Sequence, residues 1–384
     1  MVAKELMMAL LREAVDGTFV ANIDESLLDD NTLCELFELA QSQDLAHIVA
    51  YSLEKRGALP KNEVGDRFSR LMMLAAYRYE GQAYEVGRVS AAFERQGIDH
   101  ALLKGAVMRH KYPKPWMRTM SDVDILIKED ELERAVSVLC RELGYTERER
   151  GAHDVSLFSA GGVHIELHFR LMDEQSIGVL GEESAKVMRQ AWQTASLCEN
   201  SAHSYELSGE AFYTYHLAHM AKHILNGGCG VKPFLDTLVL SLTQTPAVVG
   251  DRIKAFETGV LRLCKVWFGD GAHDENTLLL ENYVLSGGVY GNEAQRAAAG
   301  QSAKGGKLAY IFGRIFLPYD ELKYRYPVLK KHKWLTPLFE AVRWISLPFK
   351  KGISETGREL GAIGDVSRDS SDKLSAMLSG LGLK

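Results

Sequence analysis

Apolar and polar residues alternate over the first 97 positions with the three- and four-residue spacing of amphipathic helices. The opening stretch MVAKELMMALLREAVDG places Glu5 and Glu13 among apolar residues, which predicts a helix and not a signal peptide. Residues 62–96 keep the same spacing over a longer run, and Gly97 follows it as a terminator. The pattern predicts a helical N-terminal region over residues 1–97.

Short apolar runs replace this spacing after residue 97, which predicts strands between helices. A proline-broken loop, KYPKPW, lies at 111–116, and a small turn, AGG, lies at 160–162. The predicted order is strand, helix, strand, helix, strand and strand, over residues 98–103, 105–110, 123–127, 129–143, 154–159 and 163–169.

Helical spacing returns after Gly181, most clearly at 210–225 and 233–242. Residues 287–306 are rich in glycine, alanine and serine, which predicts a loop, and the polar segment from Ser367 predicts a loosely held tail. We expect an α/β (α+β) fold with a small mixed sheet and large helical N- and C-terminal portions. The expected parts are a helical region (1–97), a core with the sheet (98–180), a helical domain that completes a cleft (181–345) and a partly flexible tail (346–384).

The 384-residue chain is 46% hydrophobic and carries a net charge of −6, which are ordinary values for a globular protein. The negative net charge disfavours electrostatic binding of nucleic acid by the protein surface as a whole, so such binding would need a local basic patch. The five cysteines are odd in number and form no CxxC pair, which argues against a disulfide framework and fits a reducing cytoplasm. No window holds the roughly eighteen apolar residues of a transmembrane helix.

One segment of the C-terminal part is both basic and aromatic: LKKHKWLTPLFEAVRWISLPFKK, at 329–351. Such segments lie on membrane surfaces in some proteins and touch nucleic acid in others. A packed amphipathic helix with solvated lysines is the commoner outcome. We expect that outcome here, rather than peripheral membrane contact.

Two acids interrupt the apolar run DVDILI at 122–127. Side chains at i and i+2 of a strand share a face, so Asp122 and Asp124 are expected to lie side by side. Neighbouring carboxylates repel unless a cation or a proton lies between them. A hard dication such as Mg²⁺ prefers oxygen ligands and is the natural partner. The alternative is a strand end whose acids are solvated or paired with Arg118 and Lys128.

A later strand repeats this alternation. In HIELHF, at 164–169, the residues His164, Glu166 and His168 share one face. If this strand lies beside the first, Glu166 becomes a third carboxylate at the same place. Three acids can hold two metal ions, the arrangement used for in-line phosphoryl or nucleotidyl transfer. We expect the two histidines to support the ligands rather than to bind metal themselves.

The pair Lys104-Gly105 follows a predicted strand and opens a predicted helix. Glycine lets a phosphate approach the backbone, and the free N–H groups of a helix N-terminus attract anions. The charges of Lys104 and Arg118 suit phosphate oxygens. For Arg118, a structural pairing that holds the acidic loop is an equal alternative.

These motifs together resemble the nucleotidyltransferase superfamily of the DNA polymerase β type, and most closely its bacterial branch of uncharacterised nucleotidyltransferases. The resemblance covers roughly residues 98–345. The matching positions are Leu103-Lys104-Gly105, Tyr112, Arg118, the run Asp122–Ile127, Gly144-Tyr145, Ile165-Glu166-Leu167-His168, the helical segment His219-Met220-Ala221-Lys222-His223, Asp236 and Tyr326-Pro327.

The resemblance implies a catalytic core at 98–180 that moves an NMP from an NTP to an acceptor with Mg²⁺ or Mn²⁺. It implies that Asp122, Asp124 and Glu166 bind the metal and carry the catalysis. It implies supporting roles for His164, His168 and His219. The implied nucleotide- and phosphate-binding residues are Lys104, Gly105, Arg118, Ser121, Lys222, His223 and Asp236. The acceptor (a small molecule, a tRNA or a protein) and the base of the NTP are left open.

The sequence departs from the superfamily at one point: Gly105-Ala106 stands where Gly-Ser is usual, so no serine hydroxyl can contact a phosphate there. Two other functional classes stay open. One is a non-catalytic nucleotide-binding or regulatory protein with the same fold. The other is a metal-dependent hydrolase that uses His and Asp ligands, raised by His216, His219 and His223, which share one helix face.

Overall fold

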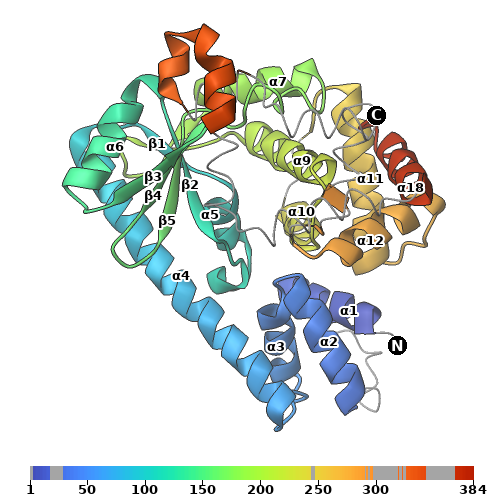
Figure 1. Cartoon of the computed structure of the whole chain (residues 1–384). Helices are drawn as coiled ribbons and strands as arrows, with labels where there is room; N and C mark the ends of the chain where they lie inside the picture. Colours follow the sequence, from blue (N-terminus) through green and yellow to red (C-terminus); the bar gives the residue numbers. More distant parts are fainter. Residues whose placement is uncertain are drawn as a thin grey trace.

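One mixed β-sheet lies beside a larger assembly of helices, and helix α4 runs along the outside of the molecule (Figure 1). The computed structural model describes residues 3–17, 29–243, 247–289, 291–292, 295–296, 319, 322, 326–342 and 368–384. The expected α/β class, with a mixed sheet between helical N- and C-terminal portions, is confirmed.

Helices α1 (Ala3–Asp16), α2 (Asp30–Ser42) and α3 (Ala46–Lys55) form a bundle at the N-terminal end of the chain. Apolar side chains of all three helices are buried against one another. An ion pair is buried with them, because Arg56 Nε donates to Glu13 Oε2 over 2.9 Å and both side chains are almost fully enclosed. Where the structure describes it, the N-terminal region is helical, as the sequence predicts.

Helix α4 (Glu63–Gln96) joins this bundle to the sheet (Figure 1). In its first half, Phe68 packs edge-on against Phe37 of α2, with ring centroids 4.9 Å apart. In its last turns, Phe93 is buried in the core that backs the sheet. The helix ends where the sequence predicts, at Gly97, whose φ of 65° lies in the left-handed region that favours glycine.

Seven strands form the sheet among the described residues, in the order β3-β4-β5-β2-β1-β7-β6. Neighbouring strands are antiparallel except for the pairs β2–β5 and β1–β7, which are parallel. In the β2–β5 pair, Asp124 lies opposite Glu166 and Asp122 lies opposite His164. The strands are β1 (His100–Leu102), β2 (Asp122–Ile127), β3 (Thr146–Arg150), β4 (Asp154–Phe158), β5 (His164–His168), β6 (Ser196–Leu197) and β7 (Ser204–Glu206).

The two faces of the sheet have different neighbours. Val123 and Ile125 lie in a core shared with α4 and α6 (Leu132–Arg141). Because side chains alternate along a strand, the acids of β2 and β5 point the other way. On that side, α5 (Lys104–Met108) and α9 (Gly209–Leu225) line a common cavity with the acids.

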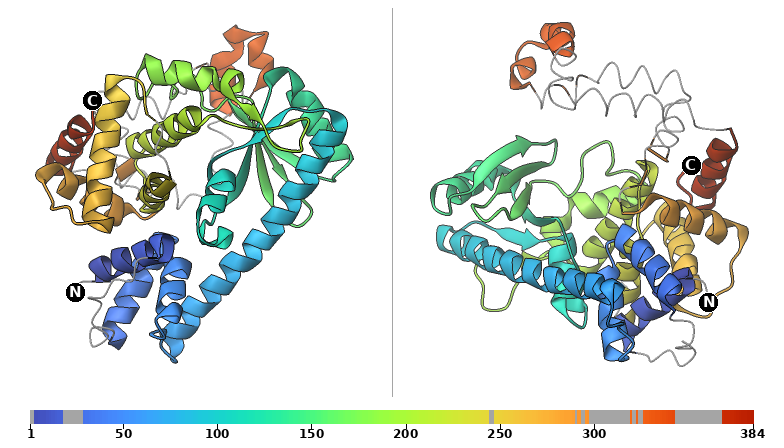
Figure 2. Two further views of the ribbon diagram at one scale, coloured as in Figure 1. Left: turned by 180° about the vertical axis from the view of Figure 1, so that it is seen from behind. Right: turned by 60° about the horizontal axis from the view of Figure 1, so that its bottom comes forward.

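Helices dominate the C-terminal part, as expected, and none of the described helices combines the length and the apolarity that crossing a bilayer requires. Helix α18 lies beside α12 in both Figure 1 and Figure 2. In the described part of the chain, the α-helices that follow the sheet core are α7 (Glu182–Arg189), α8 (Ala191–Thr194), α9, α10 (Lys232–Thr243), α11 (Asp251–Phe268), α12 (Glu275–Gly287) and α18 (Arg368–Gly380).

Two expectations about the C-terminal part need correction. The segment after Ser367 is not loosely held, because Leu374, Met377 and Leu378 are buried at helical spacing on one side of α18. The basic, aromatic segment is packed only in part: Leu329 is buried, but Trp334 is 76% exposed. Its residues 343–351 lie outside the described residues, as does most of the loop predicted at 287–306.

Three strands were missed by the sequence prediction, each for a physical reason. Strand β3 reads TERER and all its residues are exposed, so it lacks the apolar alternation that marks a half-buried strand. Strands β6 and β7 have two and three residues, too few for any periodicity. These strands occupy the two ends of the sheet and leave its centre as predicted.

The packing of α4 on α2 predicts a large effect of Phe68→Ala on stability. Truncation of this fully buried ring opens a cavity, and we expect a loss of about 3–5 kcal/mol in the free energy of unfolding, measured by urea denaturation. Tyr77→Ala on the exposed side of the same helix is the control, with an expected change within about 0.5 kcal/mol. Equal losses for the two variants would contradict this account of α4.

Candidate active site

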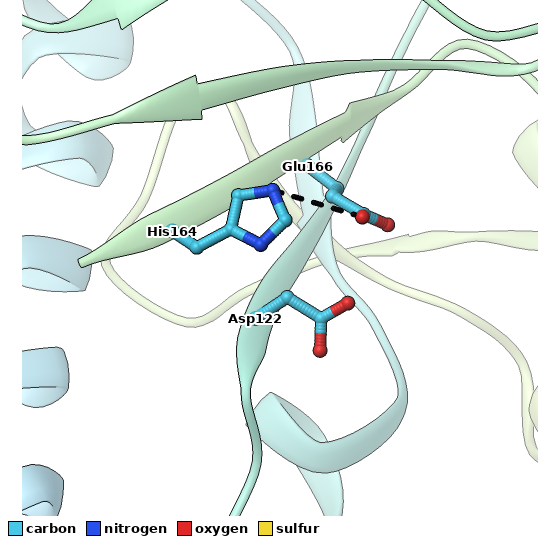
Figure 3. Close-up of side chains that lie close together, drawn as sticks. All are labelled: Asp122, His164 and Glu166. Carbon is cyan, nitrogen blue, oxygen red and sulfur yellow. Dashed lines mark ion pairs between the residues drawn. The ribbon is translucent and has the colours of Figure 1, made fainter. Parts of the chain in front are cut away.

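Three carboxylates meet on the cavity side of the sheet because β2 and β5 are parallel neighbours. Ligand atoms of Asp122, His164 and Glu166 lie within 4.8 Å of one another, and so do those of Asp124, Glu166 and His168. Figure 3 shows the first group, whose side chains converge from the two strands. The structure therefore brings together the acids that strand alternation placed on one face, and it adds one imidazole to each group.

Asp124 is buried at 4% exposure, and its negative charge is matched by two donors. Lys104 Nζ and His168 Nε2 each donate to Asp124 Oδ1 over 2.7 Å. Burial raises the pKa of Asp124, but the Lys104 charge and the His168 hydrogen bond outweigh burial and hold that pKa below its ordinary value. The carboxylate is therefore ionised at neutral pH.

Asp122 and Glu166 lie closer to solvent, and neither forms an ion pair with a lysine or arginine among the described residues. Burial, followed by the negative charges of Asp124 and Glu166, raises the pKa of Asp122. The hydrogen bond from His168 lowers the pKa of Glu166. The repulsion felt by Asp122 is the kind that a bound cation relieves.

Lys104 is held at the site by an unusual backbone conformation. Its φ of 43° lies in the left-handed region, which is rare for a residue with a Cβ atom and is found mostly where function requires it. At the next position, a Cβ would lie 3.0 Å from Met120 Sδ and 3.2 Å from Met120 Cβ. Glycine at 105 therefore lets α5 approach the loop before β2 closely, and this approach brings the Lys104 ammonium to Asp124.

A cavity of about 580 Å³ lies over the acidic cluster. Its walls come from β2, β5, α5, α9 and α10, and Asp44 and Arg78 extend it to the N-terminal helices. All the residues that the resemblance assigns to metal, nucleotide or phosphate line this cavity, and so do His168 and His219. His164 adjoins the acids without lining the cavity.

Helix α9 contributes a wall of neutral histidines. His219 Nε2 and His223 Nε2 are 3.3 Å apart, whereas His216 Nε2 contacts Thr237 Oγ1 at 3.0 Å. Burial, reinforced by the charges of Lys104 and Lys222, lowers the pKa of His223 to about 4 and moves that of His219 well below its ordinary value. Among the described residues, no third ligand joins these histidines in a metal-sized group, which disfavours a zinc hydrolase site on α9.

Arg118 and Asp236 are bonded to each other inside the cavity wall. Arg118 Nε donates to both carboxylate oxygens of Asp236, over 2.8 and 2.9 Å, and Tyr112 Oη donates to Asp236 Oδ1 over 2.8 Å. The carboxylate is 2% exposed. Of the two roles that the sequence left open for Arg118, the structure shows the structural pairing, and that pairing connects the loop before β2 to α10.

A second connection was not predicted, because no motif marks its residues. Asp44, between α2 and α3, accepts hydrogen bonds from Thr119 Oγ1 (2.9 Å) and from Lys232 Nζ. Lys232 Nζ also donates to Thr119 Oγ1 over 2.9 Å. The three residues come from distant parts of the chain, so only the fold brings them together. They attach the N-terminal bundle to the cavity.

The comparisons with known proteins identify the family. The sequence model of the family described as "Uncharacterised nucleotidyltransferase" matches residues 30–257, more than half of the chain, and the chain belongs to this family. The match begins in α2, so it includes helices that the motif resemblance over 98–345 left out, and it ends in α11, before Tyr326-Pro327. No curated protein and no solved structure matches the chain.

The pairing in the cavity wall predicts a stability effect. Asp236→Ala leaves the Arg118 guanidinium, which is 14% exposed, without its carboxylate, and we expect a loss of about 3–5 kcal/mol in the free energy of unfolding. Asp270→Ala removes a 92% exposed carboxylate from a surface pair with Lys265 and should change this free energy by at most about 1 kcal/mol. A small effect of Asp236→Ala in urea unfolding would contradict the structural role.

The neutral histidines predict a loss of stability in acid. His223 has a native pKa of about 4 and an unfolded pKa of about 6.5, so below pH 6.5 the unfolded chain binds a proton that the native protein does not. Acid therefore favours unfolding, by about 1.4 kcal/mol per pH unit between these two values. In urea unfolding from pH 7 to 4.5, His223→Gln should reduce this slope, and the exposed control His332→Gln should not. Equal slopes would contradict the prediction.

Proposed function

We propose that this protein transfers a nucleoside monophosphate from an NTP to an acceptor with the help of a divalent cation. The observation that carries the proposal is the convergence of three carboxylates from β2 and β5 in one cavity. Membership of the uncharacterised nucleotidyltransferase family gives the reaction class. Paired acids beside a cavity suit this chemistry, because such transfers place negative charge on both the attacking and the leaving oxygen.

The acidic cluster fits a hard cation such as Mg²⁺ or Mn²⁺. Asp122, Asp124 and Glu166 offer oxygen ligands, and burial together with the neighbouring charges of Asp124 and Glu166 raises the pKa of Asp122. We propose that the cluster formed by these three carboxylates holds the metal. When bound, the metal would stabilise the charge that develops on the phosphate oxygens.

The cationic side of the cavity suits the triphosphate. We propose that Lys104, Lys222 and His223 contact phosphate oxygens, since all three line the cavity and His223 can donate a hydrogen bond in its neutral form. Gly105 lets the backbone of α5 lie close to Met120 and Arg118 in the loop before β2. Ser121 orients Asp122, because its hydroxyl donates to Asp122 Oδ1 over 2.9 Å.

Arg118 and Asp236 have a different part in this proposal. Both side chains are largely buried and bonded to each other, Arg118 at 14% and Asp236 at 2% exposure, so we assign them to shaping the wall. In the reaction, an acceptor oxygen bonds to the α-phosphorus while the bond to pyrophosphate breaks, and the acceptor proton leaves to a carboxylate of the cluster or to water. The acceptor is a small molecule, a tRNA or a protein that reaches the open side of the cavity.

The organisation of the chain is part of the proposal. The sheet core at 98–180 supplies the acids, and the helical part at 181–345 supplies Lys222 and His223. The N-terminal region at 1–97 adds Asp44 and Arg78 to the same cavity. We propose that these three parts act as one catalytic unit and that residues 346–384 are peripheral to it.

The proposal predicts that the double variant Asp122→Asn/Asp124→Asn binds Mg-NTP about tenfold or more weakly, because the acidic cluster loses two of its three negative charges. Calorimetric titration with the four Mg-NTPs measures the affinity. Asp130→Asn, an exposed acid after β2, is the matched control and should keep the wild-type affinity.

Turnover is measured with NTPs labelled at the α-phosphate and with small metabolites, tRNA and proteins as acceptors. Label transfer that the double variant lacks supports the enzyme. Nucleotide binding with no transfer to any acceptor favours the non-catalytic alternative. Unchanged Mg-NTP affinity in the double variant would overturn the assignment of the site.

A further inference from the structure

The two histidines of β5 meet the acidic cluster in different ways. His168 Nε2 lies 2.7 Å from Asp124 Oδ1, and an ionised carboxylate can only accept a hydrogen bond. This nitrogen therefore carries its hydrogen and has no lone pair for a metal ion. Although Asp124, Glu166 and His168 lie close enough together for a metal, their geometry is that of a hydrogen-bonded group.

A lysine completes this inner group. Lys104 Nζ donates to the same Oδ1 atom over 2.7 Å, and the Lys104 side chain is 21% exposed while that of Asp124 is 5% exposed. An ammonium in contact with a buried carboxylate compensates its charge and repels a dication brought to the same oxygen. The inner part of the cluster therefore already has its cation.

The outer group, Asp122, His164 and Glu166, has no such partner. None of the three is in ion-pair contact with a lysine or arginine among the described residues, although their ligand atoms lie within 4.8 Å of one another. The register of β2 and β5 places Asp122 directly opposite His164. Figure 3 shows the imidazole and the two carboxyl groups converging on one region.

The imidazole of His164 is held in place from behind. Two side chains of β4 hold the ring: it stacks on Phe158, with centroids 4.3 Å apart and planes at 2°, and its Nε2 atom contacts Ser156 Oγ at 2.5 Å. The same Nε2 atom lies 3.7 Å from Glu166 Oε1, so the contact with Ser156 leaves Nδ1 as the ring nitrogen for a metal ion. A ring fixed by stacking and by a serine loses little freedom when it accepts a ligand. The outer group thus combines two oxygen donors and one oriented nitrogen donor.

We infer that the cluster binds one divalent cation, ligated by Asp122, His164 and Glu166, and that the Lys104 ammonium takes the place of a second metal ion at Asp124. This inference rests on the proposed function and deepens it. It also sets the preference of the site: Mg²⁺ favours oxygen ligands alone, whereas an imidazole ligand shifts selectivity towards Mn²⁺ and the later transition metals.

The experiment is Mn²⁺ binding to the full-length protein without nucleotide, followed by electron paramagnetic resonance. We expect one bound Mn²⁺ per chain, with a spin-echo modulation from a ligating ¹⁴N nucleus. His164→Asn should abolish the nitrogen modulation and weaken binding about tenfold or more. His168→Asn should keep the modulation. Lys104→Met should raise the stoichiometry from one to two, because it frees Asp124.

Matched controls test whether each effect belongs to the cluster. Lys128→Met removes one of the two partners of Asp99, a lysine–aspartate pair beside the ends of β1 and β2, and should leave the stoichiometry at one. His110→Asn changes an exposed histidine and should leave the modulation unchanged. Circular dichroism tests whether each variant is folded. If Lys104→Met does not fold, the wild-type stoichiometry still tests the number of bound ions, and the His164→Asn spectrum still tests the nitrogen ligand.

Two Mn²⁺ ions bound by the wild type, none bound, or a nitrogen modulation that survives in His164→Asn would overturn the inference. Its failure differs from failure of the proposed function, because the readout needs no turnover. If the protein binds one Mn²⁺ with a His164 ligand but transfers no NMP, the inference is supported and the proposed enzymatic activity is contradicted. NMP transfer by a protein that binds two ions supports the proposed function and contradicts the inference.

Discussion

The site depends on the parallel pairing of β2 with β5 in the register that sets Asp124 opposite Glu166. A shift by one residue would turn every side chain of one strand to the other face, sending its acids into the core behind the sheet and its branched side chains into the cavity. The apolar residues between the acids resist such a shift, since Val123 and Ile125 are fully buried against α4 and α6. The core thereby fixes the position of the acids on the opposite face.

Bringing three carboxylates together costs free energy, and the surroundings offset that cost unevenly. The inner carboxylate, Asp124, is compensated by an ammonium held at a strained backbone position and by an imidazole. The outer pair, Asp122 and Glu166, has no lysine or arginine in ion-pair contact among the described residues. Across the cavity, burial and, to a smaller extent, the charges of Lys104 and Lys222 lower the pKa values of His219 and His223. One cavity thus holds a negative edge suited to a cation and a positive wall suited to phosphate.

Much of the sheet core and of the acidic cluster could be predicted from the sequence. Apolar residues mark the strands of the sheet centre, and the acids interrupt the apolar run at positions two residues apart, which places them on one face. The charged strand β3 carried no such signal, and its pairing with β4 alone defines it. For Arg118, side-chain chemistry allowed both phosphate and carboxylate partners, and only the position of α10 decides between them. Asp44 and Lys232 resemble ordinary surface charges until the fold brings them together.

The hydrogen bonds from Thr119 and Lys232 to Asp44 have a practical consequence for how this chain can be divided. A fragment cut at residue 97 would keep every acid of the sheet, yet it would strip a carboxylate acceptor from a buried lysine and expose the apolar side of the segment that leads into β2. Such a fragment is expected to aggregate and to be poorly ordered in the segment before β2, next to the acidic cluster. Truncated, chimaeric and split versions of the protein should therefore retain the first helices, because these helices support the wall of the cavity.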